Sequence, residues 1–134
     1  MSDRLFTRRQ VDELIPKLTR LMEGAMERHR QATALQRQVE EEQSRIRSSG
    51  GGLIDRRDWK ARAERLEALA GLVRAALQDI LALGGVTKDL ETGLVDFPGR
   101  VGGDTVNLCW KYGETAVDFW HGLDEGYAQR KPLP

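Results

Sequence analysis

Acidic side chains and one histidine gather in the last third of the chain. The set consists of Asp96, Glu114, Asp118, His121, Asp124 and Glu125, with Cys109 nearby in the sequence. Carboxylates and an imidazole bind divalent metals and carry out general acid–base chemistry. Candidate metal ligands are therefore Asp96, Glu114, His121 and Asp124. Their spacing matches no metal motif, and the alternative is that these acids solvate the outer face of a small sheet.

Cys109 is the only cysteine of the chain and lies between Leu108 and Trp110. A reactive thiol needs a basic partner, and His121 is the one basic group nearby that fits. A buried, inert thiol is the favoured interpretation. A single cysteine excludes an internal disulfide, and the N-terminus has no secretory signal. These features predict a cytoplasmic protein, and no apolar run is long enough to span a bilayer.

Aromatic side chains concentrate in the same part of the chain. Trp110, Tyr112, Trp120 and Tyr127 are candidates for a surface that binds a ligand or a partner. The alternative is that they form the core that packs a sheet onto helices.

Long helices precede this segment and must position it. Thr7 and Gln10 form a capping box, which predicts a first helix over residues 7–47. Its apolar positions alternate in steps of four and three, which is the pattern of a heptad seam. Pro16 predicts a kink in the first turns. A glycine-rich stretch over residues 48–54 predicts a hairpin tip.

A second helix is expected over residues 55–83, with Asp55 as its cap and a seam from Trp59 to Ile80. The two helices predict an antiparallel αα-hairpin. From residue 86 the period changes to two, which predicts a β meander over residues 86–121. Pro98 places its strand, or that end of it, at a sheet edge.

The last segment of the meander, Thr115 to His121, is expected as a strand, with a helical turn through residues 119–121 left open. Residues 122–134 are expected to form a C-terminal tail. The predicted fold is a single α+β domain over residues 1–134, in which a long antiparallel αα-hairpin precedes a small antiparallel β-rich head.

Charge argues against nucleic acid as a partner. The formal net charge is zero, and charged residues make up 31% of the chain. Arginines of the first helix alternate with glutamates, which is typical of a solvated helix face. No aromatic residue lies among them to stack on bases.

Several short motifs together resemble one family. They are Gly93-Leu94-Val95-Asp96-Phe97-Pro98, Leu108-Cys109-Trp110 with Gly113-Glu114, Trp120-His121, and Gly126-Tyr127-Ala128-Gln129-Arg130, with Phe6-Thr7 before a proline-containing leucine helix. This order resembles the prokaryotic family known as domain of unknown function 2203. The resemblance covers nearly the whole chain and implies a small cytosolic protein. It implies no reaction and no established site.

Two functions remain open. The leading hypothesis is a non-enzymatic interaction or scaffold protein with an unknown protein partner, because two heptad seams occur without a recognisable catalytic motif. Flanking stripes on both helices predict a homodimer or another homo-oligomer. They consist of Leu14, Leu21 and Leu35 on the first helix and of Leu69, Leu72 and Leu83 on the second. The alternative is a metal- or small-ligand-binding protein, or an enzyme, with its site in the head. The sequence requires no cofactor, and a divalent metal belongs to this alternative.

Overall fold

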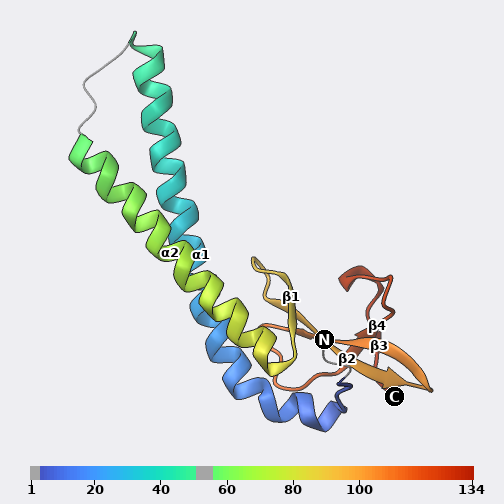
Figure 1. Ribbon diagram of the computed structural model, residues 1–134. Coiled ribbons are helices and arrows are strands. Elements are labelled where there is room, and N and C mark those ends of the chain that lie inside the picture. Colours follow the sequence, from blue (N-terminus) through green and yellow to red (C-terminus); the bar gives the residue numbers. More distant parts are fainter. Residues whose placement is uncertain (1–3, 51–55) are drawn as a thin grey trace.

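The computed structural model describes residues 4–50 and 56–134. An antiparallel hairpin of two helices projects from a small head that holds a five-stranded antiparallel sheet (Figure 1). The predicted α+β fold is confirmed. The elements are α1 (Arg8–Ser48), α2 (Arg56–Leu83), β1 (Val86–Asp89), β2 (Leu94–Val101), β3 (Asp104–Lys111), β4 (Phe119–His121), the 3-10 helix η1 (Tyr127–Gln129) and β5 (Lys131–Pro132).

The start of α1 follows from its capping box. Thr7 Oγ1 accepts from the Gln10 amide at 3.1 Å, and Gln10 Oε1 accepts from the Thr7 amide at 2.9 Å. Two backbone amides that have no partner inside the helix are thereby satisfied. Pro16 lies inside α1, and the helix, 41 residues long in all, is not interrupted by it. The helix changes direction within its first turns (Figure 1), as the proline predicts.

The hairpin is densely packed only near the head. The first half of the α1 seam is buried from Val11 to Ala25, whereas Val39 is the one buried residue beyond Met26 in the described part of α1. On α2, the two buried residues come one from each predicted stripe, Ile80 from the seam and Leu69 from the flanking stripe. Leu69 is only 2% exposed although it was placed in the flanking stripe, and Trp59 is 37% exposed although it was placed in the seam. Only the partner helix covers the distal half of the hairpin, so few side chains are enclosed there.

The expected hairpin tip falls largely on residues outside the described part of the chain, as does the expected cap at Asp55. The described end of α1 is closed by Ser49, whose amide donates to the Arg45 carbonyl at 3.0 Å. Arg45 and Arg47 in its last turn complement the negative end of the helix dipole.

The strands follow one another in space in the order of the sequence, β1-β2-β3-β4-β5. Beyond residue 96, β2 has no partner in β1, and Phe6 takes that place, donating from its amide to the Pro98 carbonyl at 2.7 Å. Pro98 therefore lies at an edge end of β2, as its missing amide requires. One face of the sheet packs against the helices with Val95, Phe97, Leu108 and Trp110 in the core.

Two expectations for the end of the chain are wrong in part. The strand predicted over residues 115–121 is limited to Phe119–His121, because the Val117 amide donates to Asp12 Oδ1 of α1 at 2.7 Å instead of to a neighbouring strand. The expected tail also joins the sheet, since Lys131 pairs with Trp120 and Pro132 pairs with Phe119 as β5.

Gly84 and Gly113 provide a matched test of how the hairpin joins the head. Both have a positive φ, 108° and 99°, but a Cβ on Gly84 would lie 2.1 Å from Phe6 Cζ, whereas nothing lies within 4 Å of one on Gly113. We expect Gly113→Ala to destabilise the fold by about 1 kcal/mol through backbone strain. Gly84→Ala should cost about 1–3 kcal/mol more because Phe6 must move. Urea denaturation measures both, and equal losses would contradict this packing.

Candidate functional site

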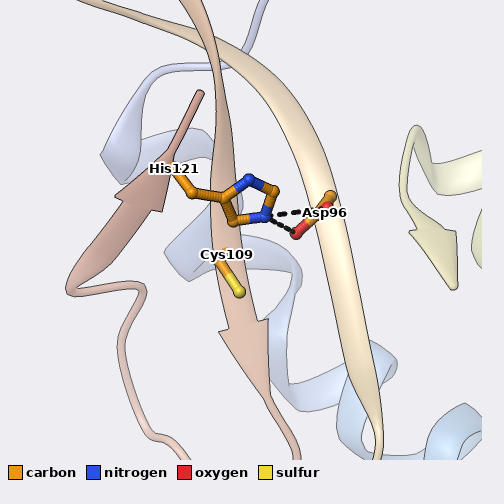
Figure 2. Close-up of side chains that lie close together, drawn as sticks. All are labelled: Asp96, Cys109 and His121. Atoms are coloured by element: carbon orange, nitrogen blue, oxygen red, sulfur yellow. Dashed lines mark hydrogen bonds and ion pairs between the residues drawn. The ribbon is translucent and has the colours of Figure 1, made fainter. Parts of the chain in front are cut away.

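The face of the sheet that points away from the helices brings three chemically active side chains together. Asp96 of β2 and Cys109 of β3 are direct cross-strand partners. His121 of β4 pairs with Asn107, two residues before Cys109, so it stands diagonally from the thiol on the same face. Figure 2 shows the imidazole pointing toward Asp96 with the Cys109 sulfur beside them.

The cluster of Asp96, Cys109 and His121 is compact and almost closed to solvent. The residues are 3%, 1% and 3% exposed, respectively. One ligand atom from each lies within 4.8 Å of the other two. A nitrogen, a sulfur and a carboxylate oxygen at these separations form a donor set that a transition-metal ion accepts after small side-chain adjustments.

The hydrogen bonds of His121 define which of its two ring nitrogens faces the cluster. Nδ1 lies 2.9 Å from the Gly122 carbonyl oxygen, which can only accept, so Nδ1 carries a hydrogen. Nε2 faces Asp96, 3.1 Å from Oδ1 and 3.0 Å from Oδ2. A bare lone pair on Nε2 would repel the carboxylate. A proton or a metal cation must therefore lie between the two groups.

Neighbouring residues hold the His121 turn in place. Glu125 Oε1 accepts from the Gly122 amide at 2.7 Å and from Lys131 Nζ at 2.6 Å. The hydrogen bond from Lys131, followed by that from Gly122, keeps the pKa of Glu125 below its ordinary value. Gly122 is thereby anchored from β5, and its carbonyl orients the imidazole as the outer partner of a metal-binding histidine does.

The Cys109 thiol is protonated near neutral pH in the metal-free protein. Burial raises its pKa to about 11, against an opposing hydrogen bond from Arg130, and the negative charge of Asp96 acts in the same direction as burial. This pKa supports the prediction of an inert thiol over that of a nucleophile. A metal ion would still bind the sulfur by displacing its proton.

Arg130 and Glu114 form a second charged pair next to the thiol. Arg130 Nη2 lies 3.0 Å from Glu114 Oε2, and its Nη1 lies 3.3 Å from Oε1 and 3.9 Å from the Cys109 sulfur. Burial alone lowers the pKa of Arg130, but the hydrogen bonds to Glu114 and Cys109 outweigh it and raise the pKa. Glu114 is itself fixed, because Oε1 accepts from the Lys111 amide at 2.6 Å.

The four predicted metal ligands therefore do not meet at one site. Asp96 and His121 meet, whereas Glu114 binds Arg130 and Asp124 is exposed. Cys109, which the sequence placed only nearby, completes the cluster instead. Arg130 was missed as a site residue, because no sequence signal pairs it with Glu114 from 16 positions away.

The four candidate aromatic residues form no common surface. Trp110 is fully buried on the helix side of the sheet, where its Nε1 donates to the Glu114 carbonyl at 2.9 Å. Tyr112 and Trp120 pack against the same core. Tyr127 is 44% exposed and covers Arg130 on the other face of the sheet, away from the helices. Trp110 thus belongs to the core, and Tyr112 and Trp120 pack against it, as the alternative interpretation expected.

Comparison with known families agrees with the motifs. A family described as an uncharacterized conserved protein (DUF2203) matches residues 4–133. The chain belongs to this family. Comparison with curated proteins and with solved structures gave no match. Among the described residues, no helix combines the length and apolarity that crossing a membrane requires.

Asp96 and His121 should depend on each other for stability. In the metal-free protein, Asp96→Asn or His121→Gln leaves the other group buried without its partner and should cost about 3–5 kcal/mol. The double variant should lose less than the sum of the two, by about 1–3 kcal/mol. Urea denaturation in the presence of a chelator measures all three variants. Strictly additive losses would show that the two side chains do not interact.

Proposed function

We propose that the head is a metal-binding module in which Asp96, Cys109 and His121 hold one divalent transition-metal ion. The orientation of His121 carries the proposal. Its Nδ1 donates to the Gly122 carbonyl, which leaves Nε2 to face a carboxylate and a sulfur. This arrangement, with a backbone carbonyl on one nitrogen and the metal on the other, is how proteins usually hold a metal-binding imidazole.

Zinc is the ion that suits these donors best. Thiolate, imidazole and carboxylate are all ordinary zinc ligands, whereas calcium and magnesium take oxygen ligands. A divalent ion bound to one thiolate and one carboxylate leaves no net charge in the buried cluster, so burial is not opposed by an unpaired charge. Three protein ligands also leave one coordination position open, as in catalytic zinc sites.

The proposal also agrees with the predicted cytoplasmic location. A reducing compartment keeps a single cysteine as a thiol, and only the thiolate derived from it binds a metal. Because the ligands come from β2, β3 and β4, a bound ion would join three neighbouring strands of the head.

Metal content and metal spectroscopy test the proposal. Protein purified without chelator should hold about one zinc per chain, and cobalt(II) added to the metal-free protein should produce a thiolate-to-cobalt absorption band. Cys109→Ser should abolish that band, because the sulfur is lost at nearly unchanged volume. Asp96→Asn and His121→Gln should weaken cobalt binding at least about tenfold, the usual effect of losing a direct ligand or its support.

Asp124→Asn is the matched control, since Asp124 is an exposed carboxylate of the same head. It should bind cobalt as the wild-type protein does. A wild-type protein that binds neither metal, or a Cys109→Ser variant that keeps the cobalt spectrum, would reduce Asp96–His121 to a structural ion pair and overturn the proposal.

Self-association through the hairpin is the second candidate function, supported by apolar side chains that the hairpin leaves uncovered. Leu72 is 46% exposed and Trp59 is 37% exposed on α2. Leu69 no longer contributes, because it is buried inside the hairpin. Of the flanking residues of α1, Leu14 and Leu21 already pack against the core, and Leu35 is half-buried. A second copy of the hairpin in a four-helix arrangement would cover Leu35, Trp59 and Leu72.

Equilibrium sedimentation at micromolar concentration measures this association. We expect a dimer that Leu72→Gln converts to a monomer, because the change places an amide in an apolar contact. Leu123→Gln is the control, since Leu123 is 59% exposed but lies in the head, and it should leave the dimer intact. A monomeric wild-type protein would reject the second function without affecting the first.

A further inference from the structure

The cluster of Asp96, Cys109 and His121 lies next to the C-terminal segment, residues 126–134, through Arg130. Phe119 stands opposite Cys109 on the same face of the sheet. The guanidinium of Arg130 covers this position, with its Cζ 4.0 Å from the centre of the Phe119 ring. The same group lies 4.6 Å from the Tyr127 ring, so it is held between two aromatic faces above the thiol. The segment is therefore the wall that separates the cluster from solvent on this side.

Few backbone contacts attach this wall to the rest of the head. β5 has two residues and pairs with β4 at the edge of the sheet. Beyond it, the Leu133 amide donates to the Asp118 carbonyl at 2.7 Å. By comparison, β2 and β3 pair along eight positions. An edge segment with so few backbone bonds opens at a lower free energy than the rest of the sheet.

We propose that residues 126–134 form a lid over the metal site and that the ion pair between Arg130 and Glu114 is its latch. This inference rests on the proposed function. Glu114 is suited to the role because its backbone belongs to the turn after β3 and not to the lid. Its carboxylate is fixed by the Lys111 amide, so it offers Arg130 a rigid partner. Opening the latch exposes Cys109, which lets a metal ion enter or leave.

Arg130 is accordingly a positioning residue and not a ligand. Its guanidinium has no atom that can bind a metal, and its Nη1 lies 3.9 Å from the Cys109 sulfur. Its charge is balanced by Glu114, so the lid closes over a site that gains no net charge from it.

The only cysteine of the chain makes the lid measurable without a metal. The test is the labelling rate of Cys109 by a thiol reagent such as N-ethylmaleimide in the metal-free protein. Glu114→Gln removes the negative charge of the latch and leaves Arg130 unchanged. It should speed labelling about tenfold or more, which is the usual effect of losing a charge-assisted hydrogen bond. Replacing the latch arginine, Arg130→Gln, should do the same. The two variants change the charge beside the sulfur in opposite directions, so faster labelling in both reflects their shared loss of the ion pair.

Glu42→Gln is the matched control. It breaks another partly buried arginine–glutamate pair, with Arg62, on the hairpin and away from the cluster. Its labelling rate should stay within about twofold of the wild type, since distant sites act independently.

The dependence on urea separates the lid from global unfolding. Opening of the lid exposes little surface, so labelling at low urea concentration should be nearly independent of urea. A labelling rate that rises with the slope of global unfolding would overturn the lid, as would equal rates for Glu114→Gln and Glu42→Gln.

Metal exchange provides the second arm of the experiment. A strong chelator should remove cobalt from the Glu114→Gln variant about tenfold faster than from the wild type, with the same absorption spectrum before removal, because the ligands are unchanged. Equal removal rates would contradict the latch. If the protein binds no metal, the proposed function fails, whereas the labelling experiment still decides whether the lid exists.

Discussion

Charge buried in a small head has to be balanced by neighbouring residues, because water is not there to stabilise it. On the far face of the sheet, Asp96 is matched by His121, and Arg130 is matched by Glu114. Each of these pairs joins segments that are distant in the sequence. The far face is therefore complete only when β2, β4, the turn after β3 and the C-terminal segment are all in place, since each of them supplies one member of a pair.

One face of the sheet forms the core and the other holds the cluster of Asp96, Cys109 and His121, because side chains alternate along β3. Leu108 and Trp110 pack toward the helices, while Cys109 between them points to the other side. A shift of one residue would bury the thiol in the core and expose the indole. The core face therefore sets the register that aligns Cys109 with Asp96. Trp110 links the two layers, since its indole nitrogen donates to the carbonyl of Glu114, whose carboxylate holds Arg130.

Much of the architecture was predictable because it depends on local signals. The Thr7 capping box, the alternating steps of the α1 seam and the change to a period of two after Gly85 each act over a few residues. Predictions failed where a partner outside the segment decides the structure. Residues 115–118 form no strand because Asp12, more than a hundred residues earlier, takes the Val117 amide. Leu69 is buried together with Ile80 of the predicted seam for a similar reason, since the angle between the two helices determines which residues of α2 are covered.

The amino-acid sequence by itself determined the elements and the chemical types available in the head: two helices, a set of short strands, one cysteine, one histidine and several acids. Only the tertiary structure decided which of these meet. Asp96, Glu114 and Asp124 are equally acidic in the sequence, yet the pairing of β3 with β2 on one side and with β4 on the other selects Asp96 alone to join Cys109 and His121. The physical reason is that strand register and the closing contact of Arg130 are long-range properties. They depend on packing across the whole head and not on the spacing of residues along the chain.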